Sequence, residues 1–278
     1  MEAELTVRIR AMSPISHGSF GEVDAGNAST FRRFDVVFPD GRSKRIPALS
    51  SNSIRGQLRR IVMRDLFERT HLSAATLDGK AWDRLYAALA NGGHLEKSEA
   101  RVDPAAMRRL REELPQLSLF GAACFSFFVE GRLKPLGQVW PVSRELVDLG
   151  LYDGLADDLP FAESLISEVS LVRHVDREEQ TPEVSGVTPM PTTVETLATG
   201  TRLIWRVRYS GSTTEVERAI LPWALDRLPH LGGKNNAGFG AVEVECLGGS
   251  PDAYQAWLDT TPMDKVEASL RALAVRLA

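Results

Sequence analysis

The sequence has few cysteines, no long apolar run and no large excess of charge of either sign. Cys124 and Cys246 lie in apolar or alternating segments, so we expect small buried side chains in a reducing compartment rather than a disulfide or a metal site. The longest apolar stretches, such as residues 117–129, are interrupted by polar residues and are too short to cross a bilayer. Residues 1–20 lack the basic start and apolar run of a secretory signal. These absences predict a cytoplasmic protein that does not enter a membrane.

Patterns that bind metals, nucleotides or catalytic protons are also sparse. The five histidines show no metal-ligand spacing, and neither Cys-x-x-Cys nor a nucleoside-triphosphate loop occurs. Ser16 and His17 lie in a polar loop after the first expected strand, where His17 could act as a general base or contact RNA. No nucleophile or carboxylate is tied to His17 in a known arrangement, although a small-molecule enzyme that uses this histidine stays an alternative. The sequence predicts no metal and no cofactor.

Charge is unevenly distributed along the chain. With 43% hydrophobic and 25% charged residues the protein is an ordinary folded one, and its net charge of −4 does not favour nucleic-acid binding by bulk charge. Between residues 30 and 60, however, eight basic residues and only two acidic ones give a net charge of +6. Such a local patch is expected where one face of a protein meets phosphate. A solvated face covered by acidic neighbours explains the patch equally well.

Hydrophobic periodicity predicts alternating strands and helices. Strands are expected at residues 5–10, 34–38, 124–129, 165–174, 202–209 and 242–246. Helices are expected at residues 54–64, in two stretches within 70–117, at 214–228 and twice near the C-terminus. A polar stretch from residue 175 to 201 is too long for an ordinary connection. This order suits a ferredoxin-like α+β domain, in which helices cover one face of an antiparallel sheet.

The first candidate functional segment opens the helix at residues 54–64. Its polar residues are candidate caps, and backbone amides at a helix start, where the dipole is positive, can bind an anion. Guanidinium groups along the next turns would add charge-assisted hydrogen bonds to phosphate. The candidate residues are Ser51, Asn52, Ser53, Arg55, Arg59 and Arg60. The alternative is a well-capped amphipathic helix with a solvated basic face.

The second candidate segment is the loop at residues 232–240, which holds four glycines in nine residues. Glycine permits positive φ and a close approach of the backbone to another chain. The loop follows a helix and precedes a strand, the reverse of the order in a dinucleotide-binding fingerprint. Its candidate residues are Gly233, Lys234, Asn235, Asn236 and Phe239, of which the phenylalanine could stack on a base or anchor the loop. The alternative is a tight structural turn.

Taken together, these segments resemble the RAMP superfamily, specifically the Cas-seven-like backbone subunits of CRISPR ribonucleoprotein complexes. The likeness is strongest to type IV subunits and next strongest to type III-like subunits. It covers most of the chain and is least diagnostic at residues 70–117. The residues that carry it are Ser13-Pro14-Ile15-Ser16-His17-Gly18, Ile46-Pro47-Ala48-Leu49-Ser50-Ser51-Asn52-Ser53-Ile54-Arg55-Gly56-Gln57-Leu58-Arg59, Leu119-Phe120-Gly121 and the glycine-rich loop.

The resemblance implies a palm with a core like that of the RNA-recognition motif, a helical fingers insertion and a thumb hairpin or loop. The implied parts are the palm at 1–69, the fingers at 70–117, palm strands at 118–174, the thumb at 175–198 and the remaining palm at 199–278. In this family the thumb displaces bases of the guide, and Val187 and Met190 are the apolar candidates for that role.

The resemblance also implies a function. Such subunits bind the phosphate backbone of a guide RNA whatever its sequence, stack on further copies of themselves into a helical filament, and present the guide to target DNA or RNA beside other effector subunits. Type III subunits cleave target RNA with an aspartate in the loop after the first strand. The matching residues 26–31 contain no carboxylate, so the sequence favours a subunit that is not an enzyme. Cleavage through Asp24 is the alternative.

Overall fold

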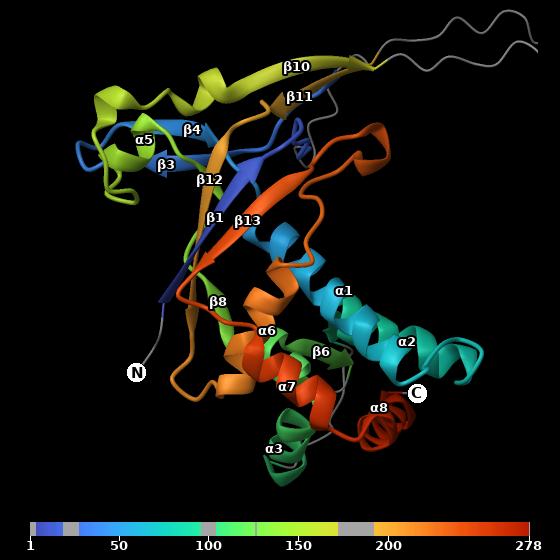
Figure 1. Ribbon diagram of the computed structural model, residues 1–278. Helices are drawn as coiled ribbons and strands as arrows, with labels where there is room; N and C mark the ends of the chain where they lie inside the picture. Colours follow the sequence, from blue (N-terminus) through green and yellow to red (C-terminus); the bar gives the residue numbers. More distant parts are fainter. Residues whose placement is uncertain (1–3, 19–27, 96–103, 126, 172–191, 278) are drawn as a thin grey trace, which may run out of the picture.

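The computed structural model of this protein describes residues 4–18, 28–95, 104–125, 127–171 and 192–277, which form a mixed α+β fold (Figure 1). The strands are β1 (Glu4–Ala11), β2 (Ala28–Ser29), β3 (Arg33–Val37), β4 (Ser43–Pro47), β5 (Gly93–Leu95), β6 (Ala122–Phe125), β7 (Phe127–Val129), β8 (Leu133–Pro135), β9 (Trp140–Pro141), β10 (Ile166–Leu171), β11 (Thr192–Leu197), β12 (Arg202–Tyr209) and β13 (Val242–Leu247). The α-helices are α1 (Ser51–Arg69), α2 (Gly79–Asn91), α3 (Pro104–Glu113), α4 (Pro115–Phe120), α5 (Arg144–Asp148), α6 (Glu215–Leu225), α7 (Asp252–Thr260) and α8 (Met263–Leu277). Short 3-10 turns are η1 (Ala156–Asp158), η2 (Ala162–Leu165) and η4 (Asn235–Ala237).

The main sheet has the order β13-β1-β12-β8, and every neighbouring pair in it is antiparallel. Helix α1 lies between β1 and β8 in the chain, and α6 lies between β12 and β13. The inward residues of β1 and β12 alternate with outward ones and pack with α1 and α6 in one core. Val7 of β1, Trp205 of β12, Leu58 of α1 and Ile220 of α6 are all completely buried there. The alternation expected at residues 5–10 and 202–209 is therefore confirmed.

A second core lies beside the first and joins distant parts of the chain. It combines the C-terminal half of α1, helix α2, strands β6 and β7, and helix α8. Leu66, Leu85, Cys124 and Leu270 represent these four parts and are all buried. Residues of the expected helical segment 70–117 thus pack against a helix more than 140 residues later in the chain. Figure 1 shows α8 next to α2 in this part of the molecule.

Two expected elements differ from the structure. The single strand expected at 124–129 is instead divided between β6 and β7, which pair antiparallel with Cys124 opposite Phe127. Phe125 has a φ of 55°, so an extended strand cannot continue through it. Within the polar stretch expected to be a loop from 175 to 201, residues 192–197 form strand β11, in which Val194 and Leu197 are buried. Val187 and Met190, the candidate thumb residues, lie outside the described residues.

Strands β10 and β11 form an antiparallel pair that β2 extends in parallel. Strand β11 is tied to the start of β3, because Glu195 Oε2 accepts hydrogen bonds from Phe31 N–H (2.7 Å) and Arg33 Nη1 (2.8 Å). Strands β3 and β4 form a hairpin whose turn is at Pro39-Asp40-Gly41, as the turn residues predict. Figure 1 shows β10 and β11 lying across one end of the main sheet.

Both cysteines are free, and burial raises the pKa of the Cys124 thiol to about 12 and that of Cys246 to about 11. Cys124 is buried, as expected, whereas Cys246 is of intermediate exposure, and neither forms a disulfide. Among the described residues, no helix combines the length and the apolar character that crossing a bilayer requires.

Candidate nucleic-acid interface

The loop after β1 holds the glycine-rich loop through its backbone. Ser16 is buried and its carbonyl accepts the N–H of Gly233 (2.8 Å). Two residues earlier, the Pro14 carbonyl accepts the N–H of Gly240 (2.8 Å). Leu231 N–H closes the base of the loop by donating to the Gly240 carbonyl (2.7 Å). The two loops therefore behave as one unit.

Glycine is required at Gly232 for a steric reason. Its φ is +82°, and a Cβ at this position would lie 2.2 Å from the carbonyl oxygen of Ser16. No real contact is that short, so the backbones of the two loops approach more closely than a side chain allows. The close approach expected of a glycine here is directed at the protein's own loop.

His17 connects the same loop to the start of α1. Its Nε2 accepts the N–H of Ser50 (3.1 Å), and its ring lies edge-on to Phe31. An accepting Nε2 means that the proton of the neutral imidazole is on Nδ1. Burial, together with the positive charge of Arg32, lowers the pKa of His17 to about 4. His17 is thus neutral near pH 7 and positions the helix start.

The helix start is only in part as the sequence predicts. Ser50 is the N-cap, with extended backbone but no side-chain capping bond. Ser51 is buried, and its N–H donates to Gln138 Oε1 (3.0 Å), while its hydroxyl donates to the Gly137 carbonyl and accepts from Trp205 Nε1. The amide of Ser53 donates to the Ser50 carbonyl (2.9 Å). Of the first three amides of α1, two therefore already have partners within the protein.

One contact joins the two candidate segments directly. Gln57 Nε2 of α1 donates to the carbonyl of Gly232 (3.3 Å). Because Arg60 follows Gln57 by three residues, the two side chains are neighbours on one side of the helix. Lys234 follows Gly232 by two residues. The structure thus places the start of α1 and the glycine-rich loop side by side.

Arg55 and Arg59 turn toward the end of α4. Arg59 Nη2 donates to the carbonyls of Phe120 (2.8 Å) and Gly121 (3.1 Å), and Arg55 Nη2 also donates to that of Phe120. Cations are favourable at these carbonyls, where a helix dipole is negative. Burial, with the nearby charges of Arg55 and Arg60, lowers the pKa of Arg59 to about 10, so it stays protonated near pH 7. In this structure both arginines link α1 to α4.

The candidate residues fall into three groups by exposure. The exposed ones are Asn52, Gly233, Lys234, Asn235 and Asn236. Those of intermediate exposure are His17, Ser53, Arg55, Arg59 and Arg60. Ser16, Ser51 and Phe239 are buried, and Phe239 therefore anchors its loop. The solvent-facing surface of the two segments consists of amide side chains, backbone and cations, without a carboxylate among the candidate residues.

Two residues that support this surface through hydrogen bonds, Gln57 and Gln138, are not indicated strongly by the sequence. Gln57 lies in the family-like stretch without a charge or a capping role to indicate it, and its place one turn after Ser53 puts it on the same face of α1. Gln138 lies 87 residues from its partner Ser51, and nothing in the local sequence predicts that contact.

The catalytic alternative rests on Asp24, which lies outside the described residues. Asp35 is on β3, exposed, and forms an ion pair with Arg45 (3.9 Å). The described residues bring no three His, Cys, Asp or Glu side chains into a group that could hold a metal ion.

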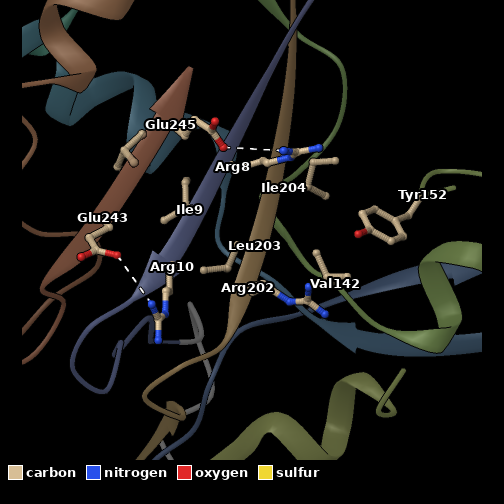
Figure 2. Close-up of a pocket in the computed structure, with 11 residues that line it drawn as sticks. Arg8, Ile9, Arg10, Val142, Tyr152, Arg202, Leu203, Ile204, Glu243 and Glu245 are labelled. Atoms are coloured by element: carbon tan, nitrogen blue, oxygen red, sulfur yellow. Dashed lines mark ion pairs between the residues drawn. The ribbon is translucent and has the colours of Figure 1, made fainter. Parts of the chain in front are cut away.

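A different surface, the open face of the main sheet, has a hollow of about 640 Å³ (Figure 2). Arg8 of β1 forms an ion pair with Glu245 of β13 (3.6 Å), and Arg10 of β1 forms one with Glu243 (3.9 Å). Arg202 comes from β12, on the other side of β1 from β13. Sheets of the RNA-recognition-motif type bind bases by stacking them on aromatic residues of the central strands. The outward positions drawn on β1 and β12 are Arg8, Arg10, Arg202 and Ile204, and none of these four side chains is an aromatic platform for stacking.

Comparisons with known proteins give a match at the level of the fold. No family model matches the sequence, and no curated protein matches it. A chain of a solved structure described as "Type IV-B CRISPR Complex" has a similar fold, with a TM-score of 0.57 and 24% sequence identity. The match covers 88% of this chain and 91% of that chain. The protein described here therefore shares its fold, over nearly its full length, with a chain of a type IV-B CRISPR complex.

Proposed function

We propose that this protein is a non-catalytic backbone subunit of a CRISPR effector complex that binds the phosphate backbone of a guide RNA. The observation that carries the proposal is the convergence of two distant segments. Three hydrogen bonds join the loop after β1, the start of α1 and the glycine-rich loop. They link Ser16 to Gly233, His17 to Ser50 and Gln57 to Gly232. The similar chain in a type IV-B CRISPR complex supports the same function.

The sheet topology supports a ferredoxin-like palm. The order of elements is β1, α1, β8, β12, α6 and β13, and the order in the sheet is β13-β1-β12-β8. This is the arrangement of a βαββαβ unit with both helices on one face. We assign residues 70–117 to the fingers and 175–198 to the thumb, with Val187 and Met190 as candidates to displace bases.

The chemistry of the surface suits an RNA backbone rather than particular bases. Lys234 and Arg60 supply positive charge, and Asn52, Asn235 and Asn236 supply amide donors. Phosphate contacts position a strand without reading its sequence, which leaves the bases of a guide available for pairing. Buried Ser16, Ser51 and Phe239 fix the shape of this surface instead of contacting the strand.

A guide covered along its length needs many copies of such a subunit. We propose that copies of this chain stack head to tail into a helical filament, because a heterologous contact that does not close on itself extends indefinitely. Within that assembly the guide would pair with target DNA or RNA, and other effector subunits would bind the ends.

The test replaces Lys234 and Arg60 by glutamine together. Each lost phosphate contact on a single strand lowers the salt slope of log K by about 0.7, so losing two weakens binding about 25-fold at 0.1 M salt. We expect the same factor for two RNAs of unrelated sequence, measured by fluorescence anisotropy at several salt concentrations.

The matched control replaces the exposed Lys80 of α2 and Arg109 of α3 by glutamine, with the same change in net charge. Its RNA affinity should stay within about twofold of the unmodified protein. Equal affinities for the two double variants, or a loss confined to one RNA sequence, would contradict the proposed function.

A further inference from the structure

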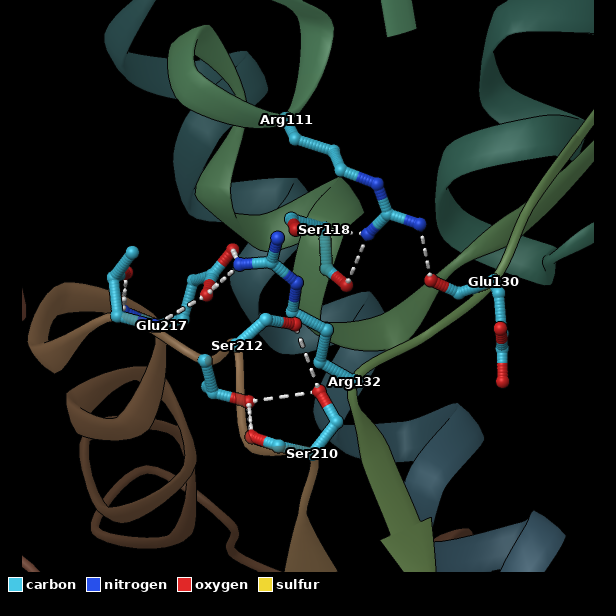
Figure 3. A network of polar contacts seen from close by, with 9 residues as sticks. Arg111, Ser118, Glu130, Arg132, Ser210, Ser212 and Glu217 are labelled. Carbon is cyan, nitrogen blue, oxygen red and sulfur yellow. Dashed lines mark hydrogen bonds and ion pairs between the residues drawn. The ribbon is translucent and has the colours of Figure 1, made fainter. Parts of the chain in front are cut away.

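A cluster of cations and hydroxyls lies where α3, α4, the turn between β7 and β8, and the turn between β12 and α6 meet (Figure 3). None of these residues belongs to the candidate nucleic-acid interface. Arg111 comes from α3, Arg132 from the segment before β8, and Lys134 from β8 itself. Ser210 and Ser212 come from the turn after β12.

Arg111 reaches this place by binding neutral acceptors only. Its Nη1 donates to the Ser118 hydroxyl (3.0 Å), and its Nη2 donates to the backbone carbonyl of Glu130 (2.8 Å). Within the described part of the chain it forms no ion pair with a carboxylate. Its charge is therefore not balanced by any direct partner that the structure describes.

Arg132 lies next to it and has one carboxylate, which is already fully used. Its Nη1 donates to both carboxylate oxygens of Glu217, at 2.8 and 2.6 Å. Glu217 is buried, and its Oε2 also accepts the N–H of Thr214 (2.7 Å) in the capping box of α6. Glu217 is thus bound to Arg132 and to its own helix, and its charge acts on Arg111 without a direct ion pair.

Two guanidinium groups beside each other repel. Burial, and next the charge of Arg132, lower the pKa of Arg111, and the nearby carboxylates of Glu217 and Glu130 offset part of this effect. Figure 3 shows the two groups on either side of Ser118. Such an arrangement becomes favourable when an anion lies between or beside the two cations, because each guanidinium has more donors than its protein partners use.

The space for an anion is present. A hollow of about 280 Å³ is lined by Arg111, Arg132, Lys134, Ser210 and Ser212, together with the Glu130–Gly131 turn. A second hollow of about 370 Å³ shares Arg111, Arg132 and Ser212 with it. The Ser212 hydroxyl contacts only the Ser210 hydroxyl at 3.4 Å among the hydrogen bonds of the described residues, so it can turn toward a ligand. Lys134 is half exposed and pairs with the exposed Glu130 at 3.1 Å.

We propose that this hollow is a binding site for an oxyanion of the phosphate class, held by Arg111, Arg132 and Lys134 with the hydroxyls of Ser210 and Ser212. Donors that come from different sides suit a tetrahedral oxyanion, and guanidinium groups bind phosphate oxygens through paired N–H groups. The phosphate group can belong to a free phosphate or phosphomonoester, or to a phosphodiester of a bound strand.

The experiment titrates inorganic phosphate into the full chain by isothermal calorimetry, with sodium chloride balancing the ionic strength. We expect saturable binding that Arg111→Gln weakens at least about tenfold, because a charge-assisted pair is replaced by a neutral donor. Arg109→Gln on the same helix has the same charge change and is exposed, so its phosphate affinity should equal that of the unmodified protein. Lys134→Gln removes only the exposed ion pair with Glu130, so it provides a second variant should Arg111→Gln unfold.

The same variants are then titrated with a short RNA. A loss of phosphate binding alone in Arg111→Gln identifies a free phosphate or phosphomonoester as the ligand, and a parallel loss of RNA affinity identifies a phosphodiester. Both results support the site, and both are independent of the Lys234 and Arg60 variants. The site is refuted when the unmodified protein shows no saturable phosphate binding, or when Arg111→Gln and Lys134→Gln bind phosphate as tightly as Arg109→Gln.

Discussion

The close approach of Gly232 to Ser16 in the candidate interface can be tested by a pair of glycine substitutions. Gly232 and Gly238 lie in the same loop and have the same φ of +82°, but their surroundings differ. A Cβ on Gly232 would lie 2.2 Å from Ser16 O, whereas a Cβ on Gly238 meets no atom within 4 Å. Alanine at either position therefore has the same backbone strain, and only Gly232→Ala adds a collision.

The expected magnitudes follow from that difference. Left-handed backbone costs alanine about 1 kcal/mol relative to glycine, so Gly238→Ala should lower the free energy of unfolding by about that amount. Gly232→Ala must also displace the Ser16 carbonyl by about 1 Å, which disrupts its hydrogen bond from Gly233 and the Gln57 contact. Two hydrogen bonds contribute about 1–3 kcal/mol together, so Gly232→Ala should cost about 2–4 kcal/mol.

Thermal unfolding followed by circular dichroism gives the readout. One kcal/mol corresponds to a change in Tm of about 2 °C in a chain of this size, so Gly232→Ala should melt about 2–6 °C below Gly238→Ala. The reasoning fails when the two variants melt together. RNA affinity measured on the same samples should fall more for Gly232→Ala, because only this variant separates the loop from the start of α1.

Two further predictions concern α1. Arg59→Met leaves the Gly121 carbonyl without its side-chain donor and the Phe120 carbonyl with Arg55 alone, so it should lower the free energy of unfolding by about 1–3 kcal/mol in urea. Arg60→Met should change it by less than about 0.5 kcal/mol, and equal values would contradict the link to α4. The pKa of His17 is depressed from 6.5 to about 4 in the folded protein, so the unfolded chain binds the extra proton and stability falls as pH decreases from 6.5 to 4. His17→Gln should flatten this part of the stability–pH curve by about 1–2 kcal/mol, allowing for partial exposure of the ring, and an unchanged slope would show that other groups cause it.

Strong local patterns predicted the elements that they encode. Alternation predicted β1 and β12, and hydrophobic periodicity predicted the helix at 214–228, which the structure has as α6 with a full capping box at Thr214. Strand β8 could not be found in this way, because its three residues are too few to show alternation and end in Pro135. The division of residues 124–129 depends on the left-handed backbone of Phe125, a residue type that gives no signal for it.

The candidate site shows a similar limit. The sequence identified both segments, and their adjacency depends on Gln57 and Gly232, which are 175 residues apart. The spacing of Arg55 and Arg59 along the helix is the same whether the two side chains face solvent or donate to a buried carbonyl. Only the position of α4 decides this, and it is a tertiary contact that helical spacing does not encode. The RNA-binding and thumb assignments stay predictions.

The second core has a consequence for biosynthesis. Leu85 and Cys124 are buried together with Leu270 and Leu277, and Arg84 Nη1 donates to the carbonyl of Leu277. A ribosome would therefore release α2 and β6 long before the helix that covers them is made. During that interval their apolar surface would be exposed to solvent and to neighbouring nascent chains, so removal of α8 should make the protein aggregate during synthesis rather than merely shorten it.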